Sequence, residues 1–287
     1  MTALRILHRT TYNYSKPVSF GPHRMLLRPR ESRDLKLISN TVTLNVASTI
    51  TWSQDVFGNS VASASFHAMS SSLVVESVSE LELYAAHWPV FDIAASAISY
   101  PFSYSDDEWT DLGALTVQQY ADPEGRLGDW TRGFVHGPST DTLSLLKDLS
   151  NGVTLYVGYQ SREVEGTQTP TETLDRRLGS CRDMAVLFIE AVRGLGFGAR
   201  IVSGYLHNPD LNLQGISDAG CTHAWAEVFL PGAGWVTFDP TNRSVGGSNL
   251  IPIAVGRGIH QVTPVAGDFV GPVAASMGLW VEVTVAS

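Results

Sequence analysis

The sequence predicts an α+β protein in which an antiparallel β domain precedes a region of mixed helices and strands. Apolar and polar residues alternate with period two through most of the first 90 residues, and no helical periodicity of useful length interrupts them. Helical spacing of apolar residues starts only after residue 140, and strand-like runs return after residue 198. We expect a β-rich domain at 1–95 and a core at 105–250. Residues 251–287 would form a C-terminal segment with a final strand, whose packing partner the sequence leaves open.

The first 90 residues contain several strand-like runs. A turn sequence, Phe57-Gly58-Asn59-Ser60, lies between the runs 49–56 and 61–67, which predicts a hairpin. Residues 73–83 form another β-rich run. Alternate residues of one long stretch are expected to share a face: Lys36, Ile38, Asn40, Val42, Leu44 and Val46.

Helices are expected after a linker or irregular crossover at 95–110. Leu143, Leu146 and Leu149 mark one face of a helix that should stop at Asn151-Gly152. A second helix should start at Thr169-Pro170-Thr171-Glu172, which supplies a cap, a first-turn proline and an acid, and it should end at Gly179. The later strands are expected at 199–206, 222–230, 235–239 and 278–286.

Composition argues against several functional classes. The net charge is -9 and the pI is near 5.3, so nucleic acid or an anionic membrane is not expected as the main partner. One local basic concentration comprises Arg24, Arg28, Arg30 and Arg33, for which salt-bridged or solvated strand positions are expected rather than an anion site. We find neither the pattern of a secretory leader nor a run of about 18 apolar residues, and we therefore expect a cytoplasmic protein.

Cys181 is the first candidate catalytic residue. Ser180 and Asp183 predict the N-cap and the reciprocal acid of a capping box, so Cys181 should lie in the first turn of a helix that ends near Gly194 and Gly196. Unpaired backbone N–H groups and the helix dipole stabilise a thiolate there and lower the pKa of the thiol. The same N–H groups can hold the oxyanion of a tetrahedral intermediate. A small apolar residue that packs behind the helix is the alternative.

His223 and Asp239 are the other two candidates. His223 lies at the start of one predicted strand, and Asp239 closes the next, where Pro240 stops the ladder. The tight turn between the strands predicts a hairpin in which residue 229 faces residue 236. After a modest register adjustment, the carboxylate would orient the imidazole while the other ring nitrogen meets the thiol. Taken singly, each residue is more typical of a structural histidine or a turn aspartate.

Four ordered sequence blocks carry a resemblance to a known family. They are Gly179-Ser180-Cys181-Arg182-Asp183-Met184-Ala185, Ala199-Arg200-Ile201-Val202-Ser203-Gly204-Tyr205, His223-Ala224-Trp225-Ala226-Glu227-Val228 and Gly234-Trp235-Val236-Thr237-Phe238-Asp239-Pro240-Thr241-Asn242. These blocks resemble the core motifs of the bacterial transglutaminase-like family, within the transglutaminase-like cysteine protease superfamily. Residues 6–14 and 25–30 resemble the β-rich N-terminal domain that often precedes that core, so the resemblance covers nearly the whole chain.

The resemblance implies a papain-like core, in which a helix that carries the nucleophile packs on an antiparallel sheet that carries His and Asp. Cys181, His223 and Asp239 stand at the three catalytic positions of the family. The sequence departs from the family pattern at Ser180, where valine is common, and at Met184, where an aromatic is common.

Two further features of the family are less well matched. Residues 256–264 follow a downstream family segment only loosely, which leaves the role of that segment open. A second oxyanion donor is expected upstream of the nucleophile, in a stretch that contains Tyr156, Tyr159 and Gln160. For the two tyrosines, core packing is the expected role.

The chain has only two cysteines, which do not make a disulfide framework and which favour a reducing compartment. The second, Cys221, is expected to be an inert thiol, with a regulatory disulfide to Cys181 as the alternative. A zinc site formed by these cysteines with His223 and Asp239 is a further alternative, although no typical ligand spacing supports it. No cofactor or metal is expected, because neither a phosphate-binding glycine loop nor an EF-hand spacing is found.

Together these features predict thiol-dependent attack on a peptide or carboxamide carbonyl, so a peptide or protein is the expected substrate. A cysteine peptidase or amidase is expected, and a protein-crosslinking transglutaminase is the alternative, because the same three residues serve both reactions. A non-catalytic binding module on the same fold is the alternative from another class. The sequence leaves the oligomeric state open.

Overall fold

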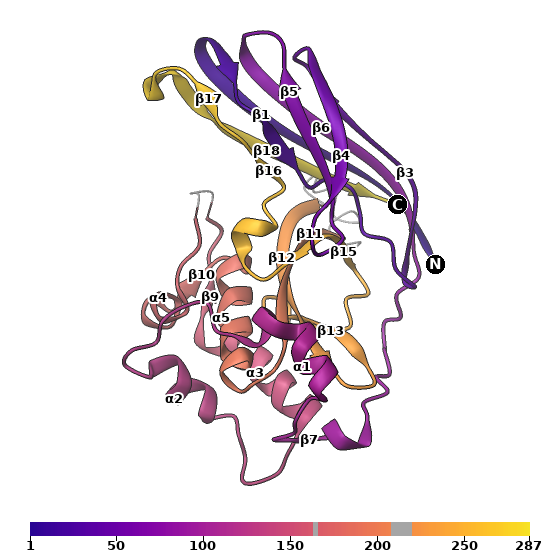
Figure 1. Ribbon diagram of the computed structural model, residues 1–287, viewed down its shortest axis with the longest axis vertical. Coiled ribbons are helices and arrows are strands. Elements are labelled where there is room, and N and C mark those ends of the chain that lie inside the picture. Colours follow the sequence, from indigo (N-terminus) through magenta and orange to yellow (C-terminus); the bar gives the residue numbers. More distant parts are fainter. Residues whose placement is uncertain (163–165, 208–219) are drawn as a thin grey trace.

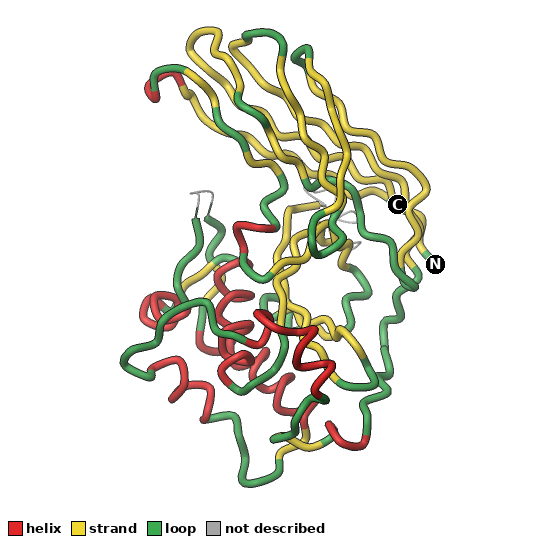
Figure 2. The backbone as a smooth tube through the Cα atoms, in the orientation of Figure 1, coloured by secondary structure: helices red, strands yellow, loops and turns green. Residues whose placement is uncertain are grey.

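The computed structural model describes residues 1–162, 166–207 and 220–287, with Gly220 and Cys221 described by their backbone only. A strand-rich part lies above a part that mixes helices and strands (Figure 1). Figure 2 shows that the long helices gather in the lower part, whereas long strands and their connections make up the upper part. This arrangement confirms the predicted α+β class. No helix of the described ranges is long and apolar enough to cross a membrane.

The upper part consists of two β-sheets. One has the order β17-β1-β6-β3, with β18 also paired to β1, and the other has the order β16-β2-β5-β4. The strands are β1 (Thr2–Phe20), β2 (His23–Met25), β3 (Leu35–Leu44), β4 (Ser48–Gln54), β5 (Ser60–Phe66), β6 (Ser70–Leu83), β16 (Val265–Ala266), β17 (Phe269–Val270) and β18 (Ser276–Ala286). Alternation along the strands turns one side inward, so residues of both sheets, such as Ala64 and Val75, form one buried cluster. β4 and β5 pair as the predicted hairpin.

The C-terminal tail completes the sheet that the N-terminus begins. β18 runs antiparallel along β1, from Arg5 opposite Ala286 to Tyr14 opposite Ser276. β16 follows the short helix η3 (Ile259–Gln261) and pairs with β2. β17 pairs with β1 and precedes the short helix η4 (Val273–Ala275). The tail, whose partner the sequence left open, therefore packs on the N-terminal sheet.

The face predicted for alternate residues from Lys36 to Val46 is wrong at its first two residues. In β3 the pairing with β6 skips Ile38, and this residue is 51% exposed. Beyond the skipped residue, Val42 and Leu44 pack against the buried cluster. The extra residue of a β-bulge reverses the alternation, so Lys36 and Ile38 do not share the face of the later residues.

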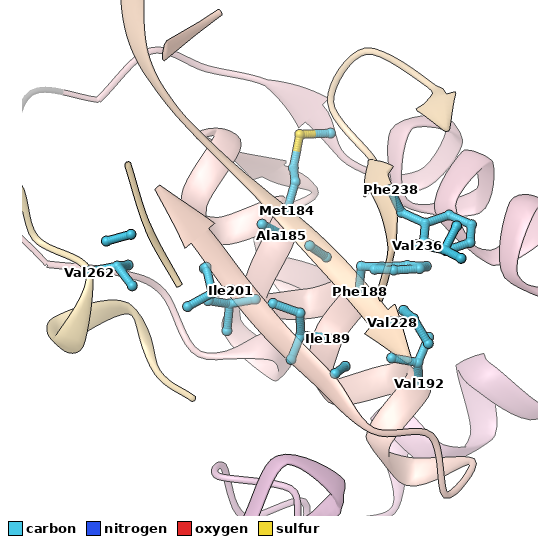
Figure 3. Close-up of a cluster of buried hydrophobic side chains, with 14 of the residues drawn as sticks. Met184, Ala185, Phe188, Ile189, Val192, Ile201, Val228, Val236, Phe238 and Val262 are labelled. Atoms are coloured by element: carbon cyan, nitrogen blue, oxygen red, sulfur yellow. The ribbon is translucent and has the colours of Figure 1, made fainter. Parts of the chain in front are cut away.

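The lower part is built around a further antiparallel sheet with the order β14-β13-β12-β11-β15. Its strands are β11 (Ala199–His207), β12 (Gly220–Leu230), β13 (Gly234–Asp239), β14 (Ser244–Val245) and β15 (Leu250–Gly256), and α5 (Cys181–Gly194) packs on one face. Figure 3 shows the contact, in which Phe188 and Ile189 of α5 lie beside Val228 and Ile201 of the sheet. Every residue from Asp183 to Arg193 is buried, because the sheet covers one side of α5 and other elements cover the rest of the helix.

The remaining elements surround α5 and lead to the sheet. They are η1 (Ala95–Ala97), β7 (Ser99–Tyr100), α1 (Asp106–Leu112), η2 (Gly113–Thr116), α2 (Arg126–Arg132), β8 (Thr140–Asp141), α3 (Thr142–Tyr156), β9 (Gly158–Tyr159), α4 (Pro170–Arg176) and β10 (Leu178–Gly179). The predicted stop at Asn151-Gly152 is wrong, because α3 continues to Tyr156. A Cβ at Gly152 would lie 2.3 Å from Cζ of Phe134, so this glycine makes room for a ring. α4 ends before the predicted Gly179, since Arg177 takes a left-handed φ of 53°.

Two buried polar contacts join the upper part to the lower sheet. Asn59 donates through Nδ2 to the carbonyl of Val255 at 2.7 Å and accepts the N–H of the same residue at 2.9 Å. His8 Nδ1 lies 3.0 Å from the hydroxyl of Tyr205 in β11, and burial lowers the pKa of His8 to about 4. The histidine is therefore neutral near pH 7, and the contact needs no counter-ion. The upper part is thereby fixed beside β11 and β15.

Three of the four arginines in the basic concentration bind groups of the chain itself. Arg24 pairs with Asp55 at 3.2 Å, and Arg33 pairs with Asp34 at 3.4 Å. Arg30 donates to the carbonyl of Phe57 and to the side-chain oxygen of Asn59. Arg28 borders an open hollow of about 500 Å³ together with Trp52. Arg24 in β2 thus matches the expected salt-bridged strand position, whereas Arg28, Arg30 and Arg33 lie outside the strands.

Candidate active site

The thiol of Cys181 lies at the start of α5. Ser180 is the N-cap, and the carboxylate of Asp183 accepts its backbone N–H at 2.8 Å and its hydroxyl at 2.7 Å. The acid of the predicted capping box is therefore in place. Cys181 is half-buried in the first turn, where backbone N–H groups and the helix dipole favour an anion on its sulfur.

Asp183 also fastens the segment before α4 to the tip of α5. Its carboxylate is fully buried, and Oδ1 accepts from Arg162 at 2.7 Å and from the N–H of Gln168 at 2.8 Å. Arg162 keeps 24% of its side chain exposed, so it connects a buried charge to the surface. Sequence reasoning gave Asp183 a capping role only and missed both partners. Arg162 and Gln168 come from another segment, so the sequence did not indicate these contacts. The one sign of a further role was that Asp183 lies close to Cys181 in the sequence.

His223 and Asp239 meet through the β12–β13 hairpin. Phe229 faces Trp235, so the predicted pairing of residues 229 and 236 is wrong by one residue. The observed loop comprises residues 231–233, one residue fewer than the loop 231–234 that the predicted strand ends imply. Continued by one position, the observed register sets Asp239 opposite Trp225, on the face that also carries His223. His223 Nε2 then lies 2.8 Å from Asp239 Oδ2, with both residues buried.

Hydrogen-bond donors satisfy both oxygens of Asp239. Oδ2 accepts from His223 and, at 2.7 Å, from the side-chain amide of Asn242. Oδ1 accepts the backbone N–H groups of Thr241 at 3.1 Å and of Asn242 at 3.3 Å. A carboxylate with no solvent exposure needs such partners. Asn242 is a site residue to which sequence reasoning gave no role, although Asp-Pro-Thr-Asn is a sequence in which an aspartate bonds to the turn after it.

Cys181 and His223 form a coupled pair. Burial opposes the thiolate and by itself would raise the pKa of Cys181. The hydrogen bond and charge of His223 act in the opposite direction, as do the backbone N–H groups of Ala224 and Arg182. Together these contacts outweigh burial, so the pKa of Cys181 is lowered. Burial also opposes the imidazolium, but Asp239 and Cys181 outweigh it and raise the pKa of His223 to about 10. Because Nε2 faces Asp239, Nδ1 is the ring nitrogen left for the sulfur. This arrangement favours a thiolate and an imidazolium near neutral pH.

The three residues named for a second oxyanion donor differ in position. Tyr156 packs its ring under the guanidinium of Arg177, 4.8 Å away, and is 37% exposed. Tyr159 and Gln160 lie beside the strand that leads to Cys181, because the Gln160 N–H donates to the carbonyl of Gly179 at 2.9 Å. Tyr159 is 58% exposed, so the expectation that the tyrosines pack in the core is wrong. A second oxyanion donor stays a prediction.

The alternatives that involve Cys221 concern a side chain outside the described residues. The backbone of Cys221 lies in β12, opposite Leu206 of β11. Among the side chains that the structure does describe, no three His, Cys, Asp or Glu residues gather as metal ligands would. The suggested disulfide and the fourth ligand of the suggested zinc site both lie outside that set.

Comparison with known proteins relates the chain to transglutaminase-like proteins. The bacterial transglutaminase-like N-terminal region matches residues 4–82, and the transglutaminase-like superfamily matches residues 128–240. An uncharacterized protein of Mycobacterium tuberculosis is 28% identical over 287 residues, which cover 92% of this chain and 86% of the relative. A protein-glutamine gamma-glutamyltransferase of Pseudomonas aeruginosa is 27% identical over 154 residues, which cover 53% of this chain and 19% of the relative.

A solved structure shares the fold over nearly the whole chain. The protein is from Cytophaga hutchinsonii and is provisionally assigned as a cysteine protease. Its TM-score is 0.74 at 19% identity, and the likeness covers 99% of this chain and 91% of that one. The predicted fold is thus confirmed, while the residue limits given for the domains stay predictions. The chain belongs to the transglutaminase-like superfamily, with a bacterial transglutaminase-like N-terminal region ahead of its core.

Proposed function

We propose that this protein is a thiol-dependent enzyme that cleaves peptide or carboxamide bonds, with Cys181 as nucleophile, His223 as acid and base, and Asp239 as the residue that orients His223. The contact that carries the proposal is the 2.8 Å hydrogen bond between His223 and Asp239, beside a thiol whose pKa is lowered. The match to the transglutaminase-like superfamily supports an enzymatic role, and so does the name of the Pseudomonas aeruginosa relative, a protein-glutamine gamma-glutamyltransferase.

In the first half-reaction, the Cys181 thiolate attacks the carbonyl carbon and forms a tetrahedral oxyanion. The backbone N–H groups of the first turn of α5 are the donors proposed to hold this oxyanion. When the C–N bond breaks, the His223 imidazolium gives its proton to the leaving amine, and a thioester remains on Cys181. Asp239 keeps the ring in line throughout and stabilises its positive charge.

In the second half-reaction, His223 takes a proton from water as the water oxygen attacks the thioester. Collapse of the new tetrahedral intermediate releases a carboxylic acid and the thiolate, and His223 is again protonated. We propose hydrolysis as the main outcome. An amine that attacks in place of water would give a new amide, and the name of the Pseudomonas aeruginosa relative favours this transfer as the second candidate. Both outcomes use the same thioester, so the access of water or amine decides between them.

The two outcomes are distinguished by incubation with a glutamine-containing peptide and a fluorescently labelled primary amine. Hydrolysis predicts ammonia and a glutamate peptide with little labelled product. Labelled peptide without hydrolysis would instead establish the second candidate. Cys181→Ala is the matched control and should form neither product. Peptide and isopeptide libraries extend the assay, and wild-type protein that forms neither product with any of them would contradict the proposed reaction.

A non-catalytic binding module on this fold predicts an ordinary thiol. Alkylation of Cys181 by iodoacetamide near neutral pH, measured by peptide mapping that separates it from Cys221, distinguishes the two proposals. An enzyme should react faster than a model thiol, whereas an equal rate would favour the binding module. Elemental analysis that found stoichiometric zinc would favour the metal site. A peptide or protein as partner and a cytoplasmic location remain part of the proposal.

A further inference from the structure

Asn242 lies in a tight turn next to the His223–Asp239 pair. β14 folds back on β13 with Ser244 opposite Asp239, so residues 240–243 make the turn between them. The turn is attached to α3, because the hydroxyl of Thr154 donates to the carbonyl of Pro240 at 2.9 Å. Since the carboxylate of Asp239 also binds the backbone of the turn, the position of Asn242 is fixed by the fold.

The side chain of Asn242 is a donor to Asp239. Its Nδ2 lies 2.7 Å from Oδ2 of the carboxylate. A carboxylate oxygen only accepts, so the reversed amide would bring two oxygens together, and this chemistry fixes the amide orientation. Nδ2 also lies 3.3 Å from His223 Nε2, but that nitrogen directs its own proton to Asp239 and has no lone pair to offer. The amide proton therefore belongs to the carboxylate.

Asn242 is exposed, whereas Asp239 is fully buried and His223 is 5% exposed. A surface residue that touches both atoms of the His–Asp hydrogen bond stands between that bond and water. Water in this place would compete for Oδ2 and raise the local dielectric, which weakens the hold of the carboxylate on the ring.

We propose that Asn242 is a positioning residue, whose amide holds Asp239 Oδ2 in line with His223 Nε2 and keeps water from their hydrogen bond. The catalytic consequence rests on the proposed function, since it acts through His223 and Cys181. The arrangement of the hydrogen bonds can be tested without a substrate. The proposal therefore allows two separate measurements, one on the thiol and one on the ring.

The test compares Asn242→Ala, Asn242→Asp and the control Asn249→Ala. The aspartate variant keeps the shape of the side chain but replaces the donor by a negatively charged acceptor that faces Asp239 Oδ2. The first measurement is the rate of Cys181 alkylation by iodoacetamide at pH 7, resolved by peptide mapping. The second is the exchange of the His223 Nε2 proton with water, followed by NMR on protein with labelled histidine. Thermal unfolding confirms that each variant is folded.

Both Asn242 variants are expected to slow alkylation about tenfold, the loss that corresponds to one hydrogen bond to a charged group. Exchange of the Nε2 proton should become faster by a similar factor, while Asn249→Ala behaves as wild type. Wild-type behaviour of the aspartate variant would overturn the proposal, because a donor is then not needed. Slower alkylation with unchanged proton exchange would overturn it too, since the substitution would then slow the thiol without affecting the hydrogen bond between His223 and Asp239. A wild-type thiol that reacts no faster than a model thiol contradicts the proposed function, and the exchange measurement still decides the role of Asn242.

Discussion

Replacement of Asp239 by Asn removes the negative charge next to His223 and keeps the shape of the side chain. Burial alone lowers the pKa of His223, and its rise from 6.5 to about 10 depends on Asp239 and Cys181. With the charge removed and the burial unchanged, this pKa should fall to its ordinary value or below it. His223 would then be largely neutral at pH 7 and would no longer stabilise the thiolate.

The fraction of Cys181 that is lost from the thiolate form sets the expected fall in the alkylation rate. Without a charged neighbour, the pKa of Cys181 should rise toward its ordinary 9.0, because burial raises it and only the backbone N–H groups of Ala224 and Arg182 remain to lower it. A thiol with that pKa is only about 1% ionised at pH 7, so about a hundredfold of thiolate is lost relative to a fully ionised site. A thiolate of higher pKa is intrinsically the better nucleophile, which offsets part of the loss. We expect alkylation of Cys181 at pH 7 to slow by about ten- to a hundredfold.

The assay is the rate of iodoacetamide alkylation of Cys181 between pH 5 and pH 11, with peptide mapping to exclude Cys221. The wild-type rate should reach its plateau well below the ordinary thiol pKa, and the rate for Asp239→Asn should rise only near or above it. Asp175→Asn is the matched control, since this aspartate pairs with Arg126 at the surface. An Asp239→Asn protein that is folded and keeps the wild-type pH profile would refute the reasoning, because His223 would then not depend on the carboxylate.

Three further substitutions test the packing and the electrostatics of the fold. Glu190→Gln leaves Arg193 without its counter-ion in a pair that is 1% exposed on each side, and should lower the free energy of unfolding in urea by about 3 kcal/mol. Gly152→Ala places a methyl group 2.3 Å from a ring carbon and should lower the melting temperature through about 1–3 kcal/mol of strain. Asp141→Ala removes the N-cap of α3, with a loss of about 1 kcal/mol at pH 7. Because hydrogen bonds from Ser144 lower the pKa of Asp141, this contribution is present above the ordinary carboxyl pKa of 3.8 and disappears as the pH falls through the lowered pKa.

The local beginnings and ends of elements could be predicted where neighbours in the sequence determine them. Ser180 and Asp183 predicted the start of α5 correctly, because a cap and its acid lie within one turn. Gly152 was misjudged, because a glycine that ends a helix and one that makes room for Phe134 look alike in the sequence. Likewise, nothing local distinguishes a regular strand from the bulge at Ile38.

The candidate site could be predicted in composition but not in geometry. Cys181, His223 and Asp239 were named from local patterns, yet the approach of the last two depends on a turn that is one residue shorter than expected. A shift of one residue moves every side chain of a strand to the other face. Arg162 and Asn242 were missed because their contacts depend on how separate segments fold together. The catalytic roles remain the proposal made above.

The pairing of β18 with β1 joins strands from opposite ends of the chain. During synthesis, the first strand leaves the ribosome long before its last neighbour exists, and the whole helical core must be made in between. Until then one edge of β1 offers unpaired N–H and C=O groups, on which strands of other chains can add. Newly made chains should therefore aggregate most readily before β18 has been made, and a protein cut before β18 should be less soluble than the full chain.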